Sequence, residues 1–427
     1  MTKPRMVFKT VLIVLIVGVG GGTVGHAGPP EPISFLHYYG LASSSAYAYR
    51  AINALVDVIN RDHPEFSVKA VNFEQEAFKT AIKAMLAGGN PPDLFTYWAG
   101  AKVQALVDAG YLEPLDDLWA QANLNDRFTP AITQAVSHNG HQYALPLTID
   151  YAAFFYNAKI FREHGLTAPT TWVEFIEVCR RLKAAGVTPI ALGARERWPA
   201  QFWFDYLLLR TAGPDYRQKL MLGQAAYTDP EVKQAYALWK EMMDQGFFNQ
   251  NPQVYDWWDA GKMVFSGQAA MTLMGSWIMA LFDGQLGWQQ QRDYDFFSFP
   301  VIDANVPLTA VGPIACVALP RERKAAAKTV LAYFSEIAPQ QAMSQIIGSL
   351  SSNKNVPAAF YTPMQQRILK IIGETPHWAF NYDLATPPPV AEIGLNSFVE
   401  FLKQPDRYPE ILEKTQQQAQ QYFQVNN

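Results

Sequence analysis

Strand-like and helix-like hydrophobic patterns alternate along the first part of the chain. Three short apolar segments have the character of buried strands: residues 33–37, 66–71 and 93–97. Apolar side chains three and four positions apart predict the helices that follow them, around residues 52–59, 78–86 and 103–107. Residues 43–45 are serines that can cap the first of these helices. Strands and helices that alternate at this spacing predict a parallel sheet with helices on both faces.

In a sheet of this kind, ligands bind outside the carboxyl ends of the strands. Tyr39 follows the first predicted strand, Glu76 follows the second, and Trp98 closes the third. We therefore expect these three side chains to face a ligand site. The alternative for the aromatic residues is a place in the core of the lobe.

A second α/β region begins near Leu145. Thr171 and Glu174 form a capping box, which predicts the start of an amphipathic helix that ends near Gly186. Further strands are predicted at residues 188–192, 271–274 and 296–300, and further helices at 202–210, 231–245, 325–337 and 390–420. The fold class is therefore α/β with two regions.

The N-terminus has the organisation of a secretory signal peptide. Lys3, Arg5 and Lys9 precede an apolar run at residues 11–19, and small residues, Gly25 and Ala27, occupy positions −3 and −1 of a cleavage site. We expect cleavage after Ala27 and export of the rest of the chain, without a cysteine there for lipid attachment. An uncleaved membrane anchor is the alternative.

Composition excludes several classes of protein. A formal net charge of −4 over 427 residues offers no basic surface for nucleic acid. The two cysteines, Cys179 and Cys316, both lie in apolar segments, so we expect buried thiols rather than a disulfide framework.

The signatures of common enzymes are missing. The chain has no G-x-S-x-G elbow, Walker A loop, H-E-x-x-H helix or G-x-G-x-x-G turn. His138 and His141 flank Asn139-Gly140, a pair that favours a hairpin turn over a metal site. A pair of glycosidase carboxylates stays open, because spacing along the chain does not report separation in space.

Several segments, in order, resemble the family 1 extracellular solute-binding proteins, the maltose-binding-like receptors of ABC sugar importers. They are FKTAIKAMLAGGNPPDLF (78–95), LVDAGYLEPLDDL (106–118), GHQYALPLTIDYAAFFYN (140–157), PTTWVEFIEVCRRLKAAGVTPIAL (169–192) and FSGQAAMTLMGSW (265–277). The resemblance covers nearly the whole chain after residue 27. It implies a two-lobed periplasmic-binding-protein fold of type II, with a cleft between the lobes.

The resemblance also implies where the lobes divide. The N-terminal lobe would comprise residues 28–144 and 306–352, and the C-terminal lobe residues 145–305 and 353–427. Hinges would lie near residues 145–147, 307–312 and 351–357. A few hinge residues would absorb the backbone change when the lobes close on a ligand.

Four further residues complete the expected site. The resemblance places a carboxylate at Asp150 and a stacking aromatic at Trp277. Trp198 and Glu196 follow the predicted strand at 188–192 and so leave it at a carboxyl end. For Trp257 and Trp258 the alternatives are lining the cleft and packing a helix, and we expect packing.

The leading hypothesis is a periplasmic receptor that passes a neutral saccharide or glycoside to an ABC permease. It would be a monomer with no cofactor and no metal. Aromatic faces suit the C–H side of a sugar ring, and carboxylates accept hydrogen bonds from its hydroxyl groups. The alternatives are an exported carbohydrate-active enzyme and a receptor of the same fold for a polyamine or another non-sugar solute.

Overall fold

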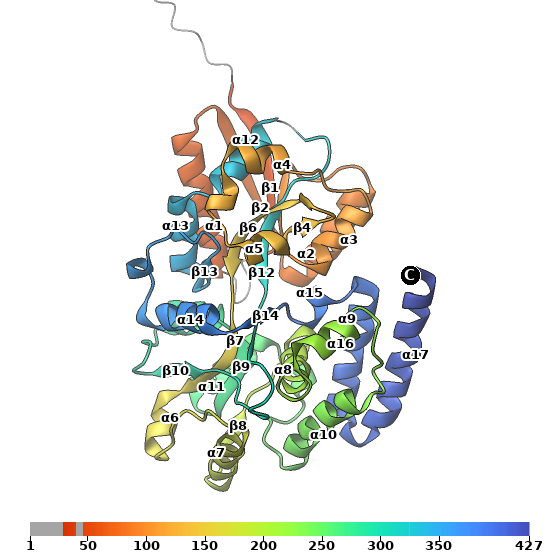
Figure 1. Cartoon of the computed structure of the whole chain (residues 1–427). Helices are drawn as coiled ribbons and strands as arrows, with labels where there is room; N and C mark the ends of the chain where they lie inside the picture. The colour runs from red at the N-terminus through yellow and green to blue at the C-terminus, as the bar shows by residue number, and fades with distance from the viewer. Residues whose placement is uncertain (1–28, 40–45, 324, 427) are drawn as a thin grey trace, which may run out of the picture.

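The computed structural model describes residues 29–39, 46–323 and 325–426, and two separate β-sheets organise them (Figure 1). The predicted signal peptide, residues 1–27, and the predicted serine cap, residues 43–45, lie outside the described residues. None of the helices in this part of the chain combines the length and the apolar character that a bilayer span requires.

The first sheet has six strands in the order β13-β6-β12-β3-β1-β2. Their bounds are Glu31–His37 (β1), Phe66–Asn72 (β2), Leu94–Trp98 (β3), Ala144–Ile149 (β6), Ile314–Ala318 (β12) and Leu350–Ser351 (β13). β1 pairs in parallel with β2 and with β3, as predicted. β12 runs antiparallel to β3 and β6, and β13 runs antiparallel to β6, so the sheet is mixed.

Helices from two separate parts of the chain pack against this sheet. They are α1 (Ala46–Asp62), α2 (Gln75–Ala87), α3 (Ala101–Asp108), α4 (Asp116–Gln121), α5 (Pro130–Ala135), α12 (Ala325–Tyr333) and α13 (Ile337–Ile347). The apolar positions that predicted α1, among them Ile52, Leu55 and Ile59, are fully buried. The predicted turn at Asn139-Gly140 joins a small hairpin, β4 (Ser137–His138) and β5 (His141–Gln142).

The second sheet has four strands in the order β10-β7-β9-β8. Their bounds are Ala152–Asn157 (β7), Thr188–Ile190 (β8), Ala269–Gly275 (β9) and Tyr294–Phe297 (β10). The helices around it are α6 (Ala158–Glu163), α7 (Trp172–Ala184), α8 (Gln201–Thr211), α9 (Gly213–Met221), α10 (Pro230–Asp244), α11 (Trp257–Ser266), α14 (Pro363–Glu374), α15 (Tyr382–Ala385), α16 (Pro388–Lys403) and α17 (Tyr408–Asn426). The predicted capping box of Thr171 and Glu174 opens α7.

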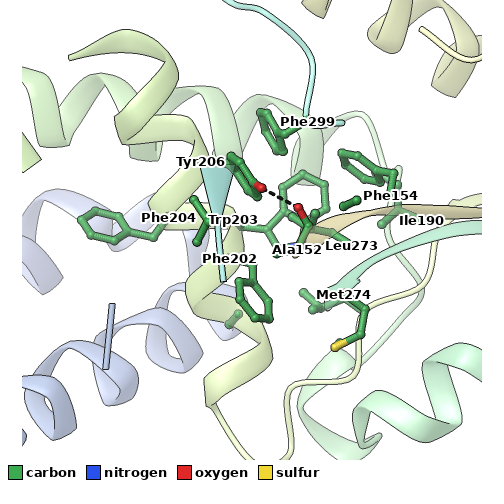
Figure 2. Close-up of a cluster of buried hydrophobic side chains, with 14 of the residues drawn as sticks. Ala152, Phe154, Ile190, Phe202, Trp203, Phe204, Tyr206, Leu273, Met274 and Phe299 are labelled. Carbon is green, nitrogen blue, oxygen red and sulfur yellow. Dashed lines mark hydrogen bonds between the residues drawn. The ribbon is translucent and has the colours of Figure 1, made fainter. Parts of the chain in front are cut away.

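The core of the second sheet is built around α8. Its residues from Gln201 to Arg210 are all buried, so the helix is enclosed on every side. The Trp203 ring of this helix packs edge-on against Phe154 at a centroid distance of 5.6 Å. Figure 2 shows the Tyr206 hydroxyl directed at the backbone oxygen of Ala152, to which it donates a hydrogen bond. Cys179 and Cys316 are fully buried free thiols in the two cores, as predicted.

The helical pattern at residues 390–420 forms two helices, α16 and α17, rather than one. The break lies at Gln404 and Pro405, because proline has no backbone N–H to continue a helical ladder. The predicted helix at 325–337 likewise ends at Tyr333, and α13 begins separately after Glu336.

The chain passes between the two sheets at several points. After β6 it leaves the first sheet through Asp150 and Tyr151, and β7 then belongs to the second. The division expected after residue 144 therefore falls at the first residue of β6, a strand of the first sheet. A second crossing runs from β11 (Thr309–Val311) through Gly312 to β12, and β11 pairs with β14 (His377–Ala379).

Candidate functional site

A pocket with a volume of about 130 Å³ lies between the two sheets, beside the first crossing. Aromatic side chains from both sides line it: Tyr38, Tyr39, Trp98, Trp198, Phe202, Trp257 and Trp277. Two lysines and two aspartates also line it: Lys79, Lys102, Asp150 and Asp383.

Five of the seven side chains expected from the sequence line this one pocket. They are Tyr39, Trp98, Asp150, Trp198 and Trp277. They come from the ends of β1, β3, β6 and β9 and from the loop after β8. The carboxyl ends of the strands thus converge in the way that the α/β pattern predicts.

Glu76 and Glu196 do not line the pocket. Glu76 is the second residue of α2 and forms an exposed ion pair with Lys79, with N and O atoms 2.7 Å apart. Its neighbour Gln75 lines the pocket instead, because successive helical side chains point about 100° apart. Glu196 lies against Arg195, 3.2 Å away, and burial together with the carboxylate of Asp256 raises its pKa.

Trp257 lines the pocket, although the sequence indicated a packing role for it. Asp256 and Asp259 form a capping box at the start of α11, which places Trp257 at the first helical position. The sequence pattern of that capping box, an aspartate three residues before another, could have placed Trp257 at the start of a helix. Trp258, the next residue, is buried as predicted.

Three tryptophans converge on the second-sheet side of the pocket. The ring centroid of Trp277 lies 5.9 Å from that of Trp198 and 6.4 Å from that of Trp257. Gly275 lies directly under the Trp277 ring, since a Cβ atom there would be only 2.0 Å from the indole. The glycine therefore allows the ring to fold back over the end of β9 and form part of the pocket wall.

Trp98, on the first-sheet side, is more enclosed. The Tyr38 ring stacks on it at a centroid distance of 4.3 Å and an interplanar angle of 13°. The ammonium group of Lys102 lies 4.8 Å from its ring centroid, within the range of a cation–π contact. With 8% of its surface exposed, Trp98 holds its neighbours in place more than it offers a free stacking face.

Asp150 is a buried carboxylate that has no cationic partner in the described part of the chain. Only 6% of its surface is exposed, and the Ser276 hydroxyl donates a hydrogen bond of 2.7 Å to it. Burial raises its pKa from 3.8 to about 6, although hydrogen bonds from Ser276, Ser349 and the Trp277 backbone oppose the change. The pocket therefore contains a carboxylate, that of Asp150, which receives hydrogen bonds but has no positive charge beside it among the described residues.

Asp383 differs from Asp150 because it has a cation beside it. Its carboxylate lies 2.5 Å from the Lys102 ammonium, which comes from α3, 281 residues earlier in the chain. Burial opposes ionisation of Asp383, but Lys102, together with Lys79 and Gln201, outweighs burial and lowers the pKa of Asp383. This pair joins α15 to the first sheet at the edge of the pocket.

The residues present suit binding of a small polar molecule. Aromatic faces, hydroxyl groups, amides and one unpaired carboxylate surround the space. Within residues 29–39, 46–323 and 325–426, no group of three His, Cys, Asp or Glu side chains is arranged to hold a metal ion.

The sequence of the chain matches a known protein family. The sequence pattern of the bacterial extracellular solute-binding proteins matches residues 42–341. An uncharacterized ABC transporter extracellular-binding protein of Pyrococcus horikoshii is 30% identical over 338 residues, which cover 76% of this chain and 73% of that one. A probable sugar-binding periplasmic protein of Mesorhizobium japonicum is 26% identical and covers 78% of each chain.

Solved structures share the fold over almost the whole chain. The bacterial solute receptor AcbH superposes with a TM-score of 0.85 at 27% identity, covering 92% of this chain and 99% of that one. A chitin oligosaccharide binding protein superposes with a TM-score of 0.83 at 24% identity and the same coverage. The predicted α/β binding-protein fold is confirmed. The chain belongs to the bacterial extracellular solute-binding proteins, a family of receptors rather than enzymes.

Proposed function

We propose that this protein is the substrate-binding component of an ABC importer and that it captures a neutral saccharide or glycoside in the pocket between the two sheets. The observation that carries the proposal is the unpaired, buried carboxylate of Asp150 beside Trp277. A sugar supplies the matching groups, since its hydroxyls donate to a carboxylate and its C–H face packs on an indole.

The names of related proteins support the class of ligand. The Mesorhizobium japonicum relative is a probable sugar-binding protein, and a Streptococcus mutans relative that is 24% identical is a multiple sugar-binding protein. AcbH is described as having an exclusive preference for β-D-galactopyranose. These ligands differ among themselves, so they support a saccharide without identifying which one.

The charges in the pocket favour a neutral ligand. Lys102 is already matched by Asp383, and Lys79 by Glu76, so neither ammonium is free to neutralise an anion. A polyamine is the second candidate, because Asp150 has no cation beside it. Of the described residues, Asp150 is the single lining carboxylate without a cation, whereas a polyamine carries at least two ammonium groups, so the saccharide is the better match.

The proposal includes the route to the site. Residues 1–27 would direct export and be removed after Ala27, leaving a monomeric receptor in the periplasm that docks on the permease. Closure of the two lobes about the crossings at residues 150–151 and 309–313 would enclose the ligand.

Isothermal titration calorimetry of residues 28–427 against saccharides, sugar alcohols, glucosides and polyamines tests the proposal. We expect one saccharide class to bind with a stoichiometry of one and to be recovered chemically unchanged. Asp150→Asn and Trp277→Ala should each weaken that binding. Trp172→Ala, which alters a partly buried tryptophan outside the pocket, should not. A folded protein that binds polyamines and no saccharide would refute the proposed ligand.

A further inference from the structure

A second cavity adjoins the crossing at Asp150 and Tyr151. Asp150 lines the pocket described above, whereas Tyr151, the next residue, lines this other cavity, which has a volume of about 360 Å³. Its walls also include Arg210 from the last turn of α8, Thr309 at the start of β11 and Phe299. Figure 2 shows Phe299 stacked beside Tyr206, the residue one helical turn before Arg210.

Arg210 is a buried cation without an acidic partner in the described part of the chain. Only 3% of its surface is exposed, one of its terminal nitrogens donates to the backbone oxygen of Thr309 at 3.1 Å, and its Nε has no partner. The guanidinium lies 5.3 Å from the Tyr206 ring centroid. Burial lowers its pKa, and the groups that oppose this change are the phenols of Tyr206 and Tyr151 rather than a carboxylate.

Thr309 presents a second incomplete polar group next to Arg210. Its side chain is fully buried, and its hydroxyl oxygen has no hydrogen-bond partner among the described residues. The unpartnered Nε of Arg210 and the unpartnered hydroxyl of Thr309 are costly to bury, because each has lost its hydration without a replacement. The group that would complete both is a negatively charged hydrogen-bond acceptor.

We propose that this cavity binds a small oxyanion through the guanidinium of Arg210 and the hydroxyl of Thr309. Arginine suits this role because its planar fork of N–H groups matches the oxygens of sulfate, phosphate or a carboxylate. Glu374 also lines the cavity, but its side chain is 67% exposed and lies 3.8 Å from Lys370, so solvent and that ammonium screen its charge. The site is separate from the saccharide pocket and does not depend on the proposed function.

Calorimetric titration of residues 28–427 with sodium sulfate, sodium phosphate and sodium acetate, at constant ionic strength, tests the proposal. We expect saturable binding of one anion per chain, and the comparison of acetate with sulfate and phosphate separates a carboxylate site from a tetrahedral one. Arg210→Met should weaken binding about tenfold or more, as loss of a charge-assisted hydrogen bond implies. The exposed Arg61→Met variant removes the same charge elsewhere and should bind like the natural protein.

A second variant, Thr309→Val, tests the same anion site if Arg210→Met fails to fold. We expect this variant to bind the anion several-fold more weakly, and in anion-free buffer to melt at the same or a higher temperature, since it removes an unpartnered hydroxyl. The proposal is overturned if the natural protein shows no saturable binding of any of the three anions. It is also overturned if Arg210→Met and Thr309→Val both bind the anion as tightly as the natural protein. A third variant, Glu374→Gln, provides a further check: if it binds an anion and the natural protein does not, Glu374 itself pairs with Arg210 and the proposal is wrong.

Discussion

Replacing Asp150 by asparagine should stabilise the free protein at neutral pH while weakening its affinity for solute. The carboxylate is buried with a pKa raised from 3.8 to about 6, so keeping it ionised at neutral pH opposes folding. Two pKa units correspond to about 3 kcal/mol at 1.36 kcal/mol per unit. This is an upper bound for the gain, because the new amide N–H groups also need acceptors.

The pH dependence follows from the direction of the shift. Because the pKa of Asp150 is higher in the folded state, its contribution to stability is complete below about pH 4 and is lost as the pH rises through about 6. Asparagine does not titrate, so the variant should exceed the natural protein in stability above about pH 6, and the difference should disappear near pH 4. Urea unfolding followed by tryptophan fluorescence at several pH values measures it.

Asp383→Asn is the matched control, because the pKa of Asp383 is lowered by Lys102 rather than raised. It should destabilise the protein at neutral pH, the opposite sign. The reasoning about Asp150 is refuted if Asp150→Asn is less stable than the natural protein at neutral pH, or if the difference does not change with pH.

Three further predictions concern the pocket, the crossings and the core. Trp277→Ala should lower saccharide affinity about 30-fold by calorimetry, because roughly 80 Å² of lost apolar contact corresponds to about 2 kcal/mol; unchanged affinity would remove the stacking role. Gly312→Ala should lower both the melting temperature and the affinity, since the new Cβ would be 1.8 Å from a backbone oxygen of the first crossing. Gly373→Ala, where nothing lies within 4 Å, should be neutral or stabilising. Arg217→Met should cost about 3–5 kcal/mol in urea unfolding, because it leaves Asp205 buried without its cation, and a loss below 1 kcal/mol would contradict a buried ion pair.

Part of the site could be predicted because it follows from local pattern. The alternation of strands and helices indicated where each strand ends, and side chains at those ends converge in any sheet of this class. Tyr39, Trp98 and Trp277 line the pocket for this reason. Glu76 does not, because a shift of one residue along α2 turns a side chain by about 100° and brings Gln75 to the pocket instead.

Long-range relationships could not be predicted from the sequence. Asp383 of α15, among the helices around the second sheet, meets Lys102 of α3, which precedes it by 281 residues. No periodicity carries that information, because hydrophobic patterns report which face of an element is buried and not which distant element covers it. The roles of Trp257 and Arg210 depend in the same way on neighbours remote in sequence.

The sequence by itself determined the α/β class, the family and most of the strand ends. It also predicts the export signal. Those properties depend on interactions between residues a few positions apart, or on order along the chain. Only the tertiary structure decided that Asp150 is buried without a cation while Asp383 has one, and that Arg210 and Thr309 share a cavity. Burial and charge pairing depend on which segments meet in space, and it is these two quantities that make a carboxylate or a guanidinium available to a ligand.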